Sequence, residues 1–373
     1  MDFDKLLQLM IKNNGSDLFI TVNVAPSMKM NGVIRPVGKV ALTEKQVETL
    51  VRGVMTECQR KEFAETNECQ FAITDELEKA RFRVSAFRQR NMPGMILRKI
   101  ENKIPTTDEL GLPPLLQQLA MKNRGIILLV GATGTGKSTS LAAMIGHRNR
   151  NSHGHIITIE DPIEFIHQHQ GCIITQREVG IDTLTFETGL KNTLRQAPDV
   201  ILIGEIRNRE VMNYAIQYAE TGHLVFATLH ANNANQAIDR IIHFFEADRH
   251  SQLLMDLSLN LQAIVAQQLI PTSDGQGRQA AIEILLNSQL ISDYIRKGEI
   301  HEIKQVMARS RNSGMQTFDQ ALFDLYENSE ITYQDAIKYA DSPNDLRLQV
   351  KLNSRHSDNY KDKNIKKLSL DAN

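Results

Sequence analysis

The spacing of apolar residues differs between the first 100 residues and the rest of the chain. Residues 16–22 and 32–37 are short apolar stretches between polar ones, and they predict strands. Residues 43–55 have the spacing of a helix that begins with a capping threonine. Residues 80–100 predict a hairpin whose turn falls at NMPG, residues 91–94. We therefore expect a domain of mixed helices and strands at the N-terminus.

From Gly125 onward, nearly continuous apolar stretches are separated by segments with helical spacing. The predicted strands span residues 125–131, 155–161, 200–205 and 223–230. Apolar stretches without alternation indicate strands buried on both faces, and crossover helices between them indicate a parallel sheet. We expect an α/β fold here, with a pattern that becomes mostly helical beyond Ala280.

These patterns divide the chain into two domains, a linker and a tail. A smaller α+β domain is expected over residues 1–100, and a linker over 101–112, where prolines begin and the periodicity is lost. The α/β domain with its helical C-terminal part follows over 113–354. The last residues, 355–373, are polar and charged, and we expect them to be disordered.

Composition narrows the class of protein. The chain has 373 residues, of which 41% are hydrophobic and 23% charged, as in ordinary globular proteins. A formal net charge of −1 argues against a general binder of nucleic acid. No apolar stretch is long enough to cross a bilayer, and the N-terminus has no signal-peptide pattern, so we expect no transmembrane segment. Three cysteines, an odd number, are typical of a reducing compartment.

One motif, GATGTGKST, matches a phosphate-binding loop between a strand and a helix. Its glycines allow backbone N–H groups to surround phosphate oxygens, and the helix N-terminus adds a favourable dipole. Lys137 is expected to reach the β- and γ-phosphates, and Ser138 to bind Mg²⁺. The alternative is a glycine-rich turn that matches by chance. The predicted ATP-binding residues are Gly131, Ala132, Thr133, Gly134, Thr135, Gly136, Lys137, Ser138 and Thr139.

Carboxylates follow two of the predicted strands. Asp161 and Glu164 come at the end of the second strand, and Glu205 follows the third, one residue after Gly204. Ligands of open α/β sheets bind at the carboxyl ends of the strands, so these groups are expected near Lys137. The strand order of RecA-like ATPases favours Glu164 as the base that activates water. Glu205 and Asp161 are then candidate Mg²⁺ ligands.

Two alternatives to this assignment remain open. Glu205 could be the base and Glu164 the metal ligand, because the sequence gives no distances. One of Glu160 and Asp161 could instead cap a helix or lie at a solvated strand end.

Two histidines flank the fourth predicted strand. His230, after the strand, is expected to contact or sense the γ-phosphate, whereas His223, before it, is expected to support structure. A single histidine is more often an ordinary core or surface residue, and that alternative applies to both.

The motifs resemble those of the secretion-type hexameric ATPases of type II secretion and type IV pili. Residues 194–207, LRQAPDVILIGEIR, are similar to the family's Walker B signature. Residues 158–167 resemble its aspartate box, and residues 221–230 its histidine box. Residues 16–21, SDLFIT, resemble the start of the PilT/PilU branch, whose members are pilus retraction ATPases.

This resemblance implies a fold, a function and partners. The fold is an α/β RecA-like P-loop core preceded by a smaller PAS-like α+β domain. The implied function is a homo-hexameric motor that hydrolyses ATP with Mg²⁺ to power or assist type IV pilus retraction in twitching motility. The implied location is cytoplasmic, peripheral at the inner face of the inner membrane. The implied partners are a PilT-like retraction ATPase and a PilC-like platform protein of the inner membrane, with no nucleic acid.

Two features refine the resemblance. Assembly ATPases of the family typically have a four-cysteine zinc site, whereas only Cys172 lies in the α/β domain here, which favours retraction. Residues 290–299, LISDYIRKGE, depart from the AIRNLIRE-like stretch of PilT proteins. That departure keeps open a role as an ATP-binding regulatory or coupling subunit with little activity alone. A nucleic-acid translocase is disfavoured by the charge balance.

An arginine of the N-terminal domain completes the candidate site. In RFRVSAF, alternation places Arg81 and Arg83 on one face of a strand and the apolar residues on the other. The resemblance implies that Arg83 contacts the γ-phosphate of ATP bound to a neighbouring subunit. The alternative is an ordinary solvated strand face.

Overall fold

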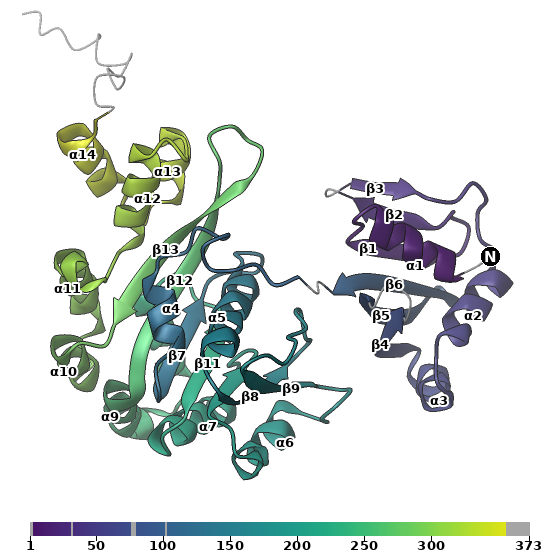
Figure 1. The fold of residues 1–373 in the computed structure, drawn as a ribbon, viewed down its shortest axis with the longest axis horizontal. Coiled ribbons are helices and arrows are strands. Elements are labelled where there is room, and N and C mark those ends of the chain that lie inside the picture. The colour runs from purple at the N-terminus through teal and green to yellow at the C-terminus, as the bar shows by residue number, and fades with distance from the viewer. Residues whose placement is uncertain (1–2, 31–32, 76–79, 101–102, 356–373) are drawn as a thin grey trace, which may run out of the picture. The chain divides into compact units, whose positions relative to one another are not determined.

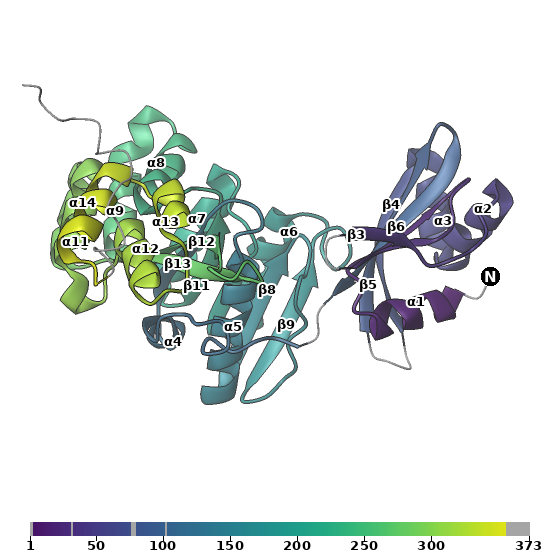
Figure 2. The ribbon, with the colours of Figure 1, turned by 90° about the horizontal axis from the view of Figure 1, so that it is seen from above.

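The computed structural model describes residues 3–30, 33–75, 80–100 and 103–355. The chain divides into two compact units. The first comprises residues 1–104 together with two later segments, 162–167 and 180–184, and the second comprises the remainder. Both units can be followed in Figures 1 and 2. Of the predicted tail, only Arg355 lies within the described residues, and the predicted boundaries around the linker remain predictions.

The first unit contains a six-stranded antiparallel sheet in the order β3-β2-β1-β6-β5-β4. Its strands are β1 (Asp17–Thr21), β2 (Ser27–Met30), β3 (Val33–Pro36), β4 (Glu68–Asp75), β5 (Ala80–Gln89) and β6 (Met92–Ile100). Its helices are α1 (Phe3–Lys12), α2 (Glu44–Gly53) and α3 (Glu57–Thr66). The side chains of Phe63, Phe71 and Phe82 are fully buried in its core. The expected helix that Thr43 begins is α2, where Thr43 forms a capping box with Gln46.

The hairpin of β5 and β6 forms as predicted, but its turn does not lie at residues 91–94. The turn is Arg90–Asn91, and both residues have positive φ, 50° and 62°. Asparagine tolerates this conformation, which two-residue hairpin turns favour. The glycine of the expected turn, Gly94, lies instead within β6 opposite Phe87. A Cβ atom there would lie 3.0 Å from the Phe87 ring, so the glycine makes room for a cross-strand aromatic side chain.

The second unit contains a seven-stranded sheet in the order β13-β12-β7-β11-β10-β8-β9. Its strands are β7 (Gly125–Val130), β8 (Gly154–Glu160), β9 (Cys172–Glu178), β10 (Val200–Ile203), β11 (Leu224–Leu229), β12 (Leu261–Pro271) and β13 (Arg278–Leu286). All neighbours are parallel except β12 and β13. The predicted α/β fold is therefore confirmed. The prediction of mostly helical structure beyond Ala280 is wrong as far as Leu286, because β13 continues to that residue.

Helices cover both faces of this sheet (Figure 1). They are α4 (Leu115–Ala120), α5 (Lys137–Asn151), α6 (Phe186–Lys191), α7 (Arg209–Glu220), α8 (Ala234–His243) and α9 (His250–Asn260). The C-terminal part adds α10 (Gln289–Lys297), α11 (Ile303–Arg309), α12 (Phe318–Glu327), α13 (Tyr333–Tyr339) and α14 (Pro343–Asn353). Ile126 and Leu128 of β7 belong to one core cluster, and Ile127 and Leu129 belong to another. Successive residues of the strand thus point to opposite faces, and both faces are buried.

A membrane-spanning helix requires about 20 mainly apolar residues. Within the described parts of the chain, no helix is both long and apolar enough to meet that requirement.

Candidate functional site

The predicted phosphate loop connects β7 to α5. Three of its residues have positive φ: Gly131 at 154°, Gly134 at 79° and Gly136 at 86°. A Cβ atom on Gly131 would lie 2.6 Å from Thr135 Oγ1 and 2.7 Å from the carbonyl oxygen of Gln267. Glycine is therefore needed here both for the backbone conformation and for space. No side chain caps the start of α5, which leaves its first N–H groups oriented as in an anion-binding loop.

Lys137 is buried at the start of α5 and holds the shape of the loop. Its Nζ donates hydrogen bonds to the carbonyl oxygens of Gly131 and Ala132, each at 2.8 Å. Thr135 Oγ1 donates to the same carbonyl of Ala132 at 2.9 Å. The structure places Ser138 and Thr139 next to Lys137 in the first turn of α5. The nine loop residues therefore form one continuous element, and their contacts with ATP remain a prediction.

The position of Glu205 is explained by the close approach of β8 to the residue before it. A Cβ atom on Gly204 would lie 3.1 Å from Glu160 Cα and 3.2 Å from the carbonyl oxygen of Ile159. The N–H of Gly204 donates to that same carbonyl at 2.8 Å. A side chain at position 204 would push the two strands apart. The first carboxylate after β10 is therefore at position 205.

Glu205 belongs to a chain of ionisable side chains at the carboxyl ends of β8, β10 and β11. Arg207 Nε donates to Glu205 Oε2 at 2.8 Å, and Arg207 Nη1 lies 3.2 Å from Asp161 Oδ2. His230 Nε2 lies 3.3 Å from Glu205 Oε1. The hydrogen bond with Glu205 is the largest cause of the raised pKa of Arg207. The guanidinium thus offsets the charge of two carboxylates.

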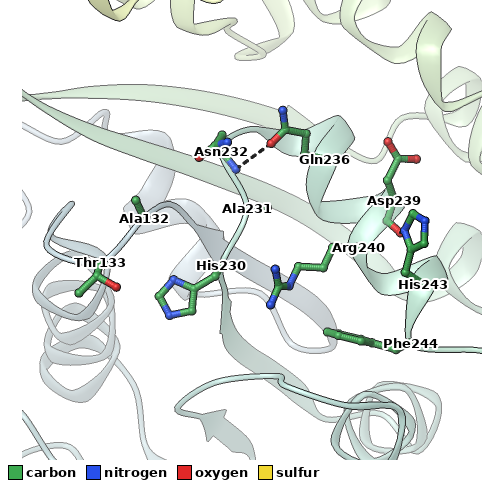
Figure 3. A pocket seen from close by; sticks show the side chains of 10 residues that line it. All are labelled: Ala132, Thr133, His230, Ala231, Asn232, Gln236, Asp239, Arg240, His243 and Phe244. Atoms are coloured by element: carbon green, nitrogen blue, oxygen red, sulfur yellow. Dashed lines mark hydrogen bonds between the residues drawn. The ribbon is translucent and has the colours of Figure 1, made fainter.

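A pocket of about 890 Å³ lies beside the phosphate loop (Figure 3). Ala132 and Thr133 of the loop line it together with His230. Figure 3 shows the side chain of Arg240 extending from α8 toward His230. The Arg240 guanidinium also lies 5.9 Å from the centre of the Phe244 ring. Cationic and imidazole groups therefore face the loop from α8 and from the end of β11.

Two predicted site residues belong to the other unit. Glu164 lies in residues 162–167, which group with the first unit, and Arg83 lies on β5. The other predicted site residues belong to the second unit. They are the phosphate loop, Asp161, Glu205 and His230. The roles of Glu164 and Arg83 remain predictions. His223 has structural contacts: its Nδ1 lies 3.2 Å from the carbonyl oxygen of Tyr218.

The predicted metal ligands fit Mg²⁺ better than a metal held entirely by protein. Ser138 is in the first turn of α5, and Asp161 and Glu205 share the partner Arg207. In the parts of the chain that the structure describes, no three histidine, cysteine or acidic side chains form a cage that could hold a metal. Mg²⁺ usually takes only one or two protein ligands and completes its shell with water and substrate phosphates. Ser138, Asp161 and Glu205 offer oxygen donors, the kind that Mg²⁺ prefers, and their role as its ligands remains a prediction.

Sequence reasoning missed the residues that α8 contributes to the pocket, among them Gln236 and Arg240. They are four residues apart on α8 and so share one face of that helix. This spacing was visible in the sequence. However, it did not indicate that this face of α8 is directed at the phosphate loop.

Three comparisons relate the chain to known proteins. A family model described as "Type II/IV secretion system protein" matches residues 2–360. The type IV pilus ATPase PilU of Pseudomonas aeruginosa is 64% identical over 371 residues, which cover 100% of this chain and 97% of that protein. The pilus retraction ATPase PilT of the same organism is 38% identical over 92% of this chain and 99% of that protein. A crystal structure of the pilus retraction motor PilT with bound ADP is similar over 93% of this chain and 99% of that one, with a TM-score of 0.87 and 35% identity.

Proposed function

Because the chain belongs to the family of type II/IV secretion system proteins, we infer that it is an ATPase that powers type IV pilus retraction. The proposal depends on one observation above all, the position of His230. It lines a pocket with Ala132 and Thr133 of the phosphate loop and lies 3.3 Å from Glu205. A phosphate-binding loop and a carboxylate near it are groups that P-loop NTPases use for hydrolysis, and the imidazole of His230 adjoins both.

The loop supplies the binding of ATP. The N–H groups of residues 131–136 and the N-terminus of α5 surround the phosphates. Lys137 exchanges the carbonyl oxygens of Gly131 and Ala132 for phosphate oxygens. Ser138, Glu205 and Asp161 are the residues that would hold Mg²⁺, which neutralises charge on the phosphates when it is bound.

We assign the activation of water to Glu164, with Glu205 near the metal and His230 as a sensor. The 3.3 Å distance between His230 Nε2 and Glu205 Oε1 supports a sensor role, because it puts the imidazole beside a carboxylate of the site. The reversed assignment makes Glu205 the base. A magnesium titration of the ATPase rate separates the two.

In this titration, Glu164→Gln should bind Mg-ATP within several-fold of the parent and lose turnover at every magnesium concentration. Glu205→Gln removes a negative charge near the metal, so high magnesium should partly restore its rate. A tenfold change in apparent metal affinity corresponds to about 1.4 kcal/mol. Rescue of Glu164→Gln alone would reverse the two roles.

The proposed assembly is a homo-hexamer in which Arg83 of one subunit contacts the γ-phosphate bound by its neighbour. Its permanently charged guanidinium suits that contact. We place the protein in the cytoplasm at the inner face of the inner membrane, working with a PilT-like retraction ATPase on a PilC-like platform protein. Similarity to PilU at 64% and to PilT at 38% supports the view that this chain is the companion motor.

A second candidate is a coupling subunit that binds ATP and has little activity alone. It is favoured by the sequence of α10, which departs from the corresponding stretch of PilT proteins. The decisive experiment measures the ATPase activity of the purified chain alone, with a PilT-like partner, and with a partner whose own phosphate-loop lysine is replaced. Turnover by the chain alone supports the motor. Turnover that never exceeds that of the partner alone supports the coupling subunit.

A further inference from the structure

A buried carboxylate on β13 lies between the first residues of two helices. The side chain of Glu283 is in the core, and the residue is 2% exposed. Its Oε1 accepts a hydrogen bond from the N–H of Ala234, the first residue of α8, at 2.7 Å. The backbone of Phe318, the first residue of α12, favours the charged form of Glu283, and the next residue of β13, Ile284, pairs with Gln316 just before that helix. Carboxylates are stabilised at helix N-termini, and Glu283 lies near the N-termini of both α8 and α12.

The first of these helices, α8, directly follows a segment that lines the pocket. Only residues 230–233 separate β11 from α8, and His230, Ala231 and Asn232 line the pocket. The hydrogen bond to Glu283 fixes the C-terminal end of this short segment. His230 and Ala234 thus lie at the two ends of one short segment, and Glu283 holds its far end.

The second helix belongs to a network that joins the C-terminal helices. Asp319 on α12 accepts hydrogen bonds from the N–H groups of Asp341 and Ser342, just before α14. Lys304 Nζ on α11 donates to Asp341 Oδ2 at 2.8 Å. Asn233 Nδ2 lies 3.4 Å from that same oxygen, so the network also contacts the pocket segment from its outer side.

The charges around Glu283 are unbalanced. Burial, with a smaller effect of the nearby charge of Asp341, raises the pKa of Glu283 to about 7. Three groups lower the pKa: the N–H of Ala234, the ammonium of Lys304 on α11 and the backbone of Phe318. Burial also raises the pKa of Asp319 on α12. Three carboxylates thus share one lysine, so small movements of α11 or α12 change the environment of Glu283.

We propose that Glu283 is a positioning residue for the ATPase reaction, which couples the pocket segment 230–233 to helices α11–α14. This inference rests on the proposed function, because it requires ATP to bind beside His230. Glu283 is not among the residues that line the pocket. It acts by holding the first turns of α8 and α12 with one side chain. A movement of one helix therefore changes the hydrogen bonding at the N-terminus of the other.

The test compares Glu283→Gln with the matched control Glu220→Gln, which makes the same chemical change at the exposed end of α7. The amide of glutamine is neutral and offers one acceptor oxygen where the carboxylate offers two, so it holds the two helix N-termini more weakly. Hydrogen exchange of residues 318–353 is measured in the full chain with and without Mg-AMP-PNP. Parent and control should show a nucleotide-dependent change in exchange, and Glu283→Gln should lose most of it. We expect kcat to fall by about fivefold or more, with KM within about twofold, as for ordinary coupling between sites.

Each outcome has one meaning. If the parent does not bind Mg-AMP-PNP, the proposed function fails rather than this inference. If the parent binds it and exchange at residues 318–353 does not change, or if Glu283→Gln retains the change, the inference is overturned. If Glu283→Gln does not fold, Glu283→Asp replaces it, because it keeps the charge but is too short to reach both helices. Full retention of coupling in that variant would equally overturn the inference.

Discussion

The substitution Glu283→Gln should also change how the stability of the second unit depends on pH. Burial raises the pKa of this carboxyl to about 7 in the folded protein, against an ordinary value of 4.5. Between these two values the folded chain keeps the proton that the unfolded chain has released. The contribution of Glu283 to stability is therefore fully present below pH 4.5 and is lost as the pH rises through 7.

The magnitude follows from the two pKa values. Together they give about 3 kcal/mol over the whole pH range, most of which is lost between pH 5 and pH 8. Burial of the side chain means that solvent screening does not reduce this figure much. Glutamine does not titrate, so the variant lacks this loss. Relative to that of the parent, its free energy of unfolding should increase by about 2–3 kcal/mol from pH 5 to pH 8.

The assay is urea unfolding of the parent, Glu283→Gln and the control Glu220→Gln at pH 5 and pH 8. Only the change in the difference between variant and parent is used, so any constant effect of the lost hydrogen bond cancels. The control should follow the parent at both pH values. If the difference between Glu283→Gln and the parent stays constant to within about 0.5 kcal/mol, Glu283 titrates normally and the argument from burial is wrong.

Three further predictions concern the candidate site. Lys137→Ala should reduce hydrolysis by orders of magnitude while circular dichroism stays that of the parent, and unchanged turnover of the pure variant would refute the assignment of the loop. Gly204→Ala should destabilise the protein by about 1–3 kcal/mol in urea, because its Cβ meets the backbone of β8 at 3.1 Å, whereas Gly53→Ala, at the end of α2 with open space around it, should be neutral or stabilising by up to about 1 kcal/mol. Mixed rings of Arg83→Ala and Glu164→Gln chains should regain part of the activity that each lacks alone, and rings that stay inactive would contradict a role for Arg83 across subunits.

The sequence was most informative where the environment of a segment is uniform. The strands β7, β8, β10 and β11 are nearly all apolar because both faces of each are covered, and all four were predicted. The strands β9, β12 and β13 were missed. In β12 the apolar stretch is interrupted by polar residues such as Gln267, whose side chain accepts a hydrogen bond from Ser140 on α5. Such a buried polar contact removes the pattern from which a strand is predicted.

For the candidate site, the motifs located individual residues but not their neighbours. Glu205 and His230 adjoin because β10 lies beside β11, although α7 separates these strands along the chain. Arg207 joins Glu205 to Asp161 only because β8 is the next strand on the other side. These contacts follow from the order of strands in the sheet, which local patterns do not specify.

The hydrogen bonds that Lys137 makes within its own loop have a consequence for how nucleotide affinity is interpreted. A phosphate that enters the loop does not meet an unengaged ammonium group, since Nζ already has two carbonyl partners at 2.8 Å. Binding is therefore an exchange reaction, and the measured affinity is the difference between two sets of contacts. Comparing the enthalpy of ADP binding in the parent and in Lys137→Ala would measure that net exchange, not the full strength of a lysine–phosphate bond. After product release the same carbonyl oxygens can take the lysine back, so the loop keeps its shape between turnovers.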